Sequence, residues 1–190
     1  IGSAGHPLMH VKVQIGDAHG FELPRNRIGE IQVRGPGVTP GYWHDPEATT
    51  AAFTAGWFRT GDAGRMTEQG IIFVVDRIKD MYISGGENVY PAEVEGVIDD
   101  LDAVSQCAVI GVPDRKWGEV GLALVVPRPG QPLAPERILE HCRERLARFK
   151  VPRDVRIVPA LPLSAQGKIL KRELHRLYVE SGGQPPSQVA

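Results

Sequence analysis

Apolar and polar residues alternate along much of the first third of the chain, which is the pattern of half-buried β-strands. Alternation or short apolar runs predict strands in four stretches: residues 11–15, 31–33, 57–58 and 71–75. Gly and Pro cluster between the second and third stretches and indicate turns. A short helix is expected after Asp45, because Pro46 can occupy the first helical position, where no N–H is needed. The N-terminal segment is therefore expected to be mainly β.

The pattern changes after Asp76. Behind Pro91, apolar residues recur at i, i+3, i+4 and i+7, which predicts an amphipathic helix with one packed face: Val94, Val97, Ile98 and Leu101. Further elements are predicted in order: strands at 105–112 and 120–126, a helix from Pro135, a strand at 155–158 and a last helix at 169–178.

These elements predict an α+β fold class. We expect a small, mainly β subdomain in residues 1–78, followed by an α+β domain in residues 79–178 with a small mixed sheet flanked by helices. Residues 179–190 contain Gly, Pro and Ser and little that could be buried, so they are predicted to form a flexible tail.

Composition excludes several classes of protein. The chain has 190 residues, 42% hydrophobic content and a formal net charge of −1, with charges of both signs spread along it, so a nucleic acid partner is not expected. No apolar run approaches the roughly 20 residues that cross a bilayer, and no secretory signal is present. We therefore predict a cytoplasmic protein without a membrane span. The first residue is Ile1 rather than Met, which favours a piece of a longer protein.

The residues most suited to metal or redox chemistry give no such signal. The six histidines lack the spacing of metal ligands, so no metal site is predicted. Cys107 lies in a strand-like run and Cys142 on a predicted helix. Both are expected to be buried free thiols rather than partners in a disulfide.

Three loops carry candidate chemistry, and each also has a plain structural interpretation. Residues 59–62 read as a turn, or as a strand end at which Asp62 could accept hydrogen bonds from vicinal hydroxyls. Residues 84–88 read as a turn, or as a place where Gly85 and Gly86 let a ligand approach bare backbone. Lys168 is either a solvated loop charge or a cation delivered to a developing negative charge.

The order and spacing of these loops resemble the adenylate-forming family of acyl-CoA synthetases, peptide-synthetase adenylation domains and luciferase. The family motifs appear in order as GEIQVRG at 29–35, GYW at 41–43, WFRTGD at 57–62, DRIKD at 76–80, SGGEN at 84–88 and GK at 167–168. The motif SGGEN at 84–88, followed by YPAEVE at 90–95, is most similar to CoA ligases of fatty and aryl acids.

This resemblance implies a reaction in which a carboxylic acid and ATP form an acyl-adenylate and pyrophosphate, and CoA then displaces AMP. It implies a nucleotide site with Asp62 on the ribose hydroxyls and Arg77 on the ribose or phosphates. Lys168 would bridge the carboxylate and the α-phosphate. The C-terminal domain would rotate about Lys79 between the two half-reactions. The pantetheine arm of CoA would then pass the loop that contains the residues Gly85, Gly86 and Glu87, with Trp117 as a wall.

The family's phosphate-binding loop and most of its acyl pocket are not in this sequence. The resemblance therefore implies the C-terminal part of an AMP-forming acyl-CoA synthetase, inactive alone, with the ligands of the Mg²⁺ that accompanies ATP lying elsewhere. The acid, whether fatty, aryl or steroid-derived, is not readable. Two alternatives stay open: an adenylation domain that loads a carrier protein, and a binding module without catalysis. Apolar surface on the β-rich part would favour self-association.

Overall fold

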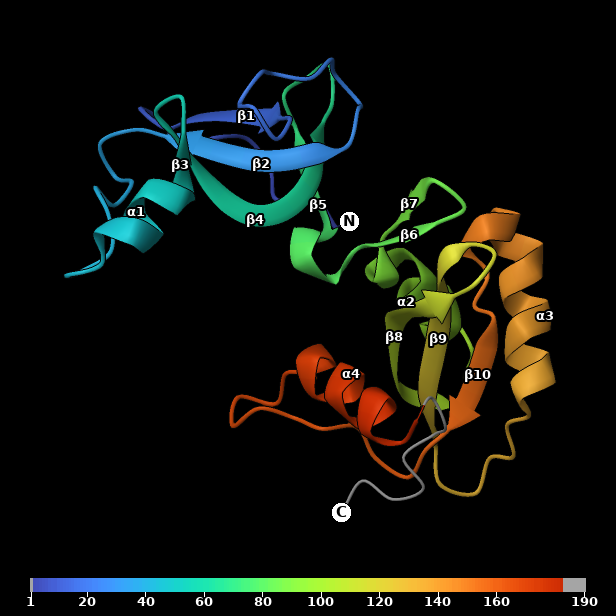
Figure 1. Cartoon of the computed structure of the whole chain (residues 1–190). Helices are drawn as coiled ribbons and strands as arrows, with labels where there is room; N and C mark the ends of the chain where they lie inside the picture. The colour runs from blue at the N-terminus through green and yellow to red at the C-terminus, as the bar shows by residue number, and fades with distance from the viewer. Residues whose placement is uncertain (1, 183–190) are drawn as a thin grey trace. The chain divides into compact units, whose positions relative to one another are not determined.

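The computed structural model describes residues 2–182 of the chain. The described residues form two compact units, which divide between Lys79 and Asp80 (Figure 1). We refer to residues 2–79 as the N-terminal unit and to residues 80–182 as the C-terminal unit, and each is described by itself.

The N-terminal unit is an antiparallel sheet in which β2 and β4 are central. The strand order is β1-β2-β4-β3, with β5 also paired to β4, and the bounds are β1 Lys12–Gly16, β2 Gly29–Arg34, β3 Phe53–Thr54, β4 Trp57–Met66 and β5 Ile72–Arg77. A small apolar cluster holds the sheet: Ile15, Ile31, Met66 and Ile72. The helix α1 (Pro46–Ala52) begins as predicted, because the Asp45 carboxylate accepts a hydrogen bond from the Ala48 N–H at 2.8 Å.

Residues 60–62 lie inside β4, which corrects the expectation of a turn or a strand end there. Between the pairs Glu30–Ala63 and Gln32–Arg59, β4 has three residues where β2 has one, so residues 60–62 form a bulge opposite Ile31. Gly61 has a φ of +73°, which favours glycine at this position. The turn-like composition therefore reflects an irregularity within a long strand.

The C-terminal unit is a mixed sheet with helices on both faces, so the predicted α+β fold class is confirmed. Its strands are β6 Tyr82–Ser84, β7 Glu87–Val89, β8 Val104–Asp114, β9 Gly118–Pro127 and β10 Asp154–Ile157. The pairing of β10 with β9 is parallel, and the pairings of β9 with β8 and of β6 with β7 are antiparallel. The α-helices are α2 Pro91–Asp99, α3 Pro135–Arg145 and α4 Lys171–Glu180, and short 3₁₀ turns lie at η1 Ile78–Asp80 and η2 Arg148–Lys150.

Apolar clusters fill the space on each face of this sheet. The helices α2 and α3 cover one face, with Val94, Ile98, Ile138 and Cys142 buried there, and α4 covers the other through Leu174 (Figure 1). Both cysteines are buried and free, as expected. Burial raises the pKa of the Cys142 thiol to about 11 and raises that of Cys107 further.

Ion pairs tie the helices of the C-terminal unit to one another and to the sheet. Glu93 of α2 pairs with Lys150 of η2, with 2.6 Å between the carboxylate and the ammonium group. Glu95 of α2 pairs with Lys171 of α4 at 2.8 Å and also accepts the Val109 N–H of β8 at 2.7 Å. These contacts hold α2, α4 and β8 as one body.

Tyr82 anchors β6 to the centre of the same sheet. Its ring lies where the side chains of two neighbouring residues would be, since a Cβ at Gly111 or Gly121 would come within 2.3 or 2.4 Å of the tyrosine. Glycine at these positions is therefore required by close packing. The short strand β6 fixes the start of the β6–β7 hairpin.

Further details differ from the sequence-based expectations, among them the short strand β3 and the length of β4, which were not predicted. The strand β7 was not predicted, because its residues are mostly polar and only Val89 is buried. The last helix runs to Glu180, so residues 179 and 180, assigned to a tail, are helical, and residues 183–190 of that predicted tail lie outside the described residues. In residues 2–182, none of the helices combines the length and the apolar character that crossing a bilayer requires.

Candidate functional site

Asp62 and Arg77 face each other on the N-terminal unit. They are directly opposite in the pairing of β4 with β5, and the Arg77 Nε lies 3.0 Å from the Asp62 Oδ1. The side chains are 34% and 56% exposed, so this is a surface ion pair that a ligand can reach. A carboxylate that accepts hydroxyl hydrogen bonds beside a guanidinium that attracts phosphate is a suitable combination for a nucleotide.

Lys168 is presented by a tight loop in the C-terminal unit. The Ser164 N–H donates to the Lys168 carbonyl at 2.8 Å, and the Gly167 N–H donates to the Ser164 carbonyl at 2.9 Å. The Ser164 hydroxyl also accepts the Lys168 N–H at 3.2 Å. Gly167 has a φ of +77°, as the turn requires. The backbone of Lys168 is thus fixed while its side chain is exposed.

The β6–β7 hairpin carries the paired glycines, and they are not equivalent. Gly85 has a φ of +62° and its backbone is covered by Trp117, because a Cβ there would lie 2.5 Å from the indole ring. Gly86 has a φ of +89° and faces open space. The bare backbone at Gly85 thus accommodates an indole ring of the chain itself, and the following Glu87 is exposed.

The pair of glycines gives a direct test of this contact. Gly85→Ala should lower the free energy of unfolding by about 1–3 kcal/mol more than Gly86→Ala, because both strain a positive φ but only the first meets the indole. Chemical denaturation of the two variants measures the difference. Equal losses would contradict a packing role for Trp117 at Gly85.

Trp117 is held by the turn between β8 and β9. Its N–H and that of Lys116 donate to the Asp114 carboxylate at 2.8 Å, and the Gly85 N–H donates to the Trp117 carbonyl at 2.8 Å. The hydrogen bond from Trp117, followed by that from Lys116, lowers the pKa of the Asp114 carboxyl, which is therefore ionised at neutral pH. This network connects the turn to the hairpin.

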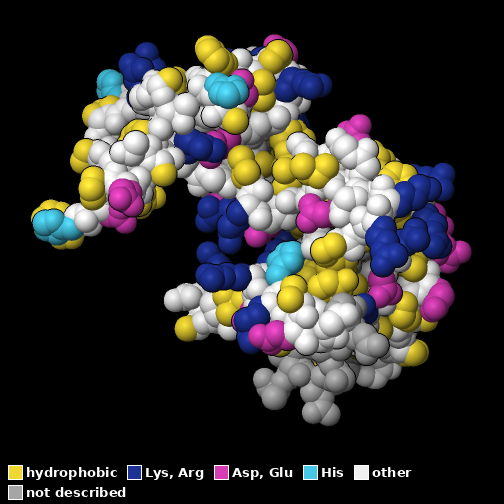
Figure 2. All heavy atoms as spheres, viewed as in Figure 1, with side chains coloured by type: hydrophobic (Ala, Val, Ile, Leu, Met, Phe, Trp, Pro, Cys, Tyr) yellow, Lys and Arg dark blue, Asp and Glu magenta, His cyan; other side chains and the backbone are white. Residues whose placement is uncertain are grey.

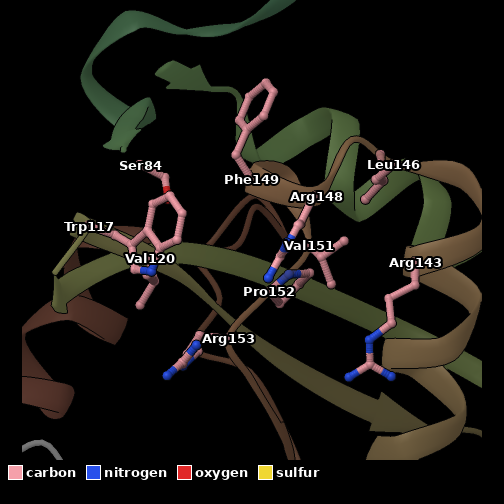
Figure 3. Close-up of a pocket in the computed structure, with 10 residues that line it drawn as sticks. All are labelled: Ser84, Trp117, Val120, Arg143, Leu146, Arg148, Phe149, Val151, Pro152 and Arg153. Atoms are coloured by element: carbon pink, nitrogen blue, oxygen red, sulfur yellow. The ribbon is translucent and has the colours of Figure 1, made fainter. Parts of the chain in front are cut away.

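A groove of about 660 Å³ runs from Ser84 and Trp117 along the C-terminal unit. Figure 3 shows Trp117 at one side and Arg143 reaching from α3 at the other, with Arg148 directed between them. Arg153, just before β10, adds a third guanidinium, and the floor is apolar, formed by residues such as Val120, Val151 and Pro152. A cationic groove with an indole wall is suited to an aromatic ligand with phosphate groups.

Sequence reasoning missed the three arginines of this groove. They come from α3, from η2 and from the segment before β10, and no motif joins them. The only signal in the sequence was their density, with four arginines and a lysine within residues 143–153.

Each unit holds one more of the predicted lysines. Lys79 is exposed in η1, where the two units divide. The Lys168 loop precedes α4, away from the β6–β7 hairpin in the same unit (Figure 1). Within residues 2–182 there is no cluster of three His, Cys, Asp or Glu side chains that could hold a metal ion.

The β-rich unit carries an exposed ion pair, and the α+β unit presents a lysine and a glycine hairpin. These features agree with the class of adenylate-forming enzymes. Comparison with known families agrees. The family model described as "AMP-binding enzyme C-terminal domain" matches residues 93–168, and the model described as "AMP-binding enzyme" matches residues 1–43. The chain belongs to this family of AMP-binding enzymes.

Individual relatives are CoA ligases of different acids. The chain is 48% identical over 178 residues to a feruloyl-CoA synthase of an Amycolatopsis species, covering 94% of this chain and 36% of that protein. It is 45% identical over 177 residues to the long-chain-fatty-acid–CoA ligase FadD13 of Mycobacterium tuberculosis, covering 93% and 35%. The chain therefore spans about a third of the length of the curated relatives that it matches.

Solved structures give the same fold. ATP-bound MatB from Rhodopseudomonas palustris superposes with a TM-score of 0.89 at 39% sequence identity, covering 96% of this chain and 37% of that one.

Proposed function

We propose that this chain is the C-terminal part of an AMP-forming acyl-CoA synthetase. In the first step a carboxylate oxygen attacks the α-phosphorus of ATP and expels pyrophosphate. In the second the thiol sulfur of CoA attacks the acyl carbon, the thiol proton passes to solvent and AMP leaves. We expect the reaction to take place in the cytoplasm, where ATP and CoA are both available. The support is similarity along more than nine-tenths of the chain to a feruloyl-CoA synthase and to a long-chain-fatty-acid–CoA ligase.

The groove is the observation that carries the proposal. CoA has an adenine ring, a diphosphate, a 3′-phosphate and a narrow pantetheine arm. Three guanidinium groups suit the phosphates, and the indole of Trp117 would form a wall for the pantetheine arm. The groove adjoins Ser84 at the hairpin, where Gly86 leaves open space for the arm beside the exposed Glu87.

The other predicted residues take the roles of the first step. Asp62 would accept hydrogen bonds from the ribose hydroxyls of ATP, and its ion pair with Arg77 holds the carboxylate in place before the nucleotide arrives. Lys168 would stabilise the negative charge that develops between the carboxylate and the α-phosphate. Lys79 would be the joint about which the C-terminal unit turns between the steps.

Magnesium is expected to accompany ATP in the first step. The described residues offer no cluster that fits a metal ion, so we expect its ligands to lie elsewhere in the complete enzyme.

The proposal covers carboxylic acids as a class, since a feruloyl-CoA synthase and a long-chain-fatty-acid–CoA ligase both match at similar identity. Exposed apolar side chains on the N-terminal unit, among them Leu8, Phe21 and Trp43, would favour self-association of the 190-residue chain (Figure 2).

The test is to assay the complete protein with ATP, CoA and a panel of fatty, aryl and steroid-derived acids. AMP release that depends on the acid, together with acyl-CoA detected by mass spectrometry, supports the proposal. An acylated carrier protein in place of acyl-CoA would indicate the carrier-loading alternative. No AMP release with any acid would contradict the adenylating function and favour a binding module.

The groove predicts a separate result in the complete enzyme. Arg148→Ala should raise the KM for CoA about tenfold, because one charge-assisted hydrogen bond to a phosphate is lost, and should leave adenylate formation unchanged. Arg137→Ala is the matched control, since Arg137 is exposed on α3 and pairs with Glu140 at 3.1 Å outside the groove. Equal KM values for the two variants would exclude this groove as the CoA site.

A further inference from the structure

Glu30 is a carboxylate buried in the N-terminal unit, with only 5% of its surface exposed. Burying a charge is costly unless its oxygens are hydrogen-bonded. Here the Oε2 accepts the Arg59 Nε–H at 2.7 Å, and the Oε1 accepts the Gly61 N–H at 3.1 Å. Both donors lie on β4, immediately before Asp62. The two oxygens of one side chain on β2 therefore hold the segment that leads to Asp62.

That segment needs such support on the side that faces β2, because its pairing with β2 is irregular, while Asp62 pairs with Arg77 of β5 on the other side. Residues 60–62 form the bulge opposite Ile31, and Gly61 has a positive φ. The Thr60 hydroxyl donates to the Ile31 carbonyl at 2.7 Å and accepts the Asp62 N–H at 3.1 Å. The N–H groups of two bulge residues, Gly61 and Asp62, thus bond to side chains, which help to set where Asp62 lies.

We propose that Glu30 is a positioning residue for the nucleotide site. Together with Arg59 it fixes the backbone at Gly61 and so directs the Asp62 carboxylate toward Arg77 and toward the ribose. The inference rests on the proposed function of Asp62, and it assigns Glu30 a role through Asp62 rather than on the nucleotide itself. The carboxylate of Glu30 is buried and binds one backbone N–H and one arginine. The accurate placement that a ligand-binding Asp62 requires explains this arrangement.

The first test measures the hold of Glu30 on the backbone in the 190-residue chain itself. Hydrogen exchange of the Gly61 amide, followed by NMR, should be at least about tenfold faster in Glu30→Ala, because its acceptor is lost. If the alanine variant does not fold, Glu30→Gln replaces it. Because Glu30→Gln keeps a single carbonyl acceptor, its Gly61 amide should exchange faster than in the unmodified chain, but by less than about tenfold. Glu22→Gln is the control, since Glu22 is exposed and pairs with Arg25 at 3.2 Å on the same unit. An unchanged exchange rate at Gly61 would overturn the proposal.

The second test measures ATP affinity in the complete enzyme by a double-mutant cycle. Glu30→Gln should weaken ATP binding about tenfold when Asp62 is present and have no further effect in an Asp62→Ala background. The same loss in both backgrounds would mean that Glu30 acts without Asp62, which overturns the proposal. If the complete protein forms no adenylate, the proposed function fails, while the exchange rate at Gly61 still decides whether Glu30 holds the bulge.

Discussion

Lys168→Ala should lower the rate of adenylate formation by about 10²–10³, which is the cost of removing one preorganised charge from a developing negative centre. The loss should appear in kcat for pyrophosphate release, because Lys168 is exposed on its loop and has no packing to lose. Formation of the thioester from a supplied acyl-adenylate should be unchanged, since that step expels AMP without needing the same charge. Separate assays of the two half-reactions measure this.

The control for this variant lies in the same loop. Gln166→Ala changes an exposed neighbour and keeps the backbone hydrogen bonds of Ser164 and Gly167. It should leave both half-reactions unchanged. Equal losses of the two half-reactions in Lys168→Ala would contradict a role confined to adenylation.

Lys79→Pro should slow one half-reaction much more than the other, because Lys79 is the proposed joint. Proline fixes φ near −65°, removes the N–H and restricts the preceding residue, so a backbone state that it excludes is disfavoured by about 3 kcal/mol, or about 10² in population. If the two steps need different backbone states at residue 79, one step should fall by about this factor and the other much less. Single-turnover rates of each step measure the ratio.

Lys79→Ala is the matched variant, because it removes the charge and keeps the backbone free. It should retain both steps. A proline variant that slows both steps equally, or neither, would remove Lys79 from the proposed role.

The helices and most of the strands could be predicted from the sequence, but β4 was predicted only at residues 57–58 and the irregular positions were not predicted. The helices after Pro46, Pro91 and Pro135 begin where proline and the apolar period indicated. The strand β7 was missed because a hairpin arm with polar residues lacks the alternation that marks a strand. Residues 60–62 read as a turn because a bulge that needs a positive φ selects the same residue types as a turn.

Some candidate site residues could likewise be predicted from the sequence, and others were recognised only in the structure. Asp62, Arg77, Lys168 and the two glycines could be predicted as candidates because each lies in a short, ordered motif. The arginines of the groove and the buried Glu30 were missed for a physical reason. Their roles depend on which residues the fold brings beside them, and single positions in a polar or alternating segment do not carry that information.

The covering of the C-terminal sheet on both faces has a mechanical consequence. A sheet that bears its own helices above and below, cross-linked by the pairs Glu93–Lys150 and Glu95–Lys171, resists bending. We therefore expect the C-terminal unit to move as one rigid body. In the proposed function, a torsional change at Lys79, just before this unit, would move the Lys168 loop and the β6–β7 hairpin together, so that the backbone at one residue would select which of the two loops takes part in a step.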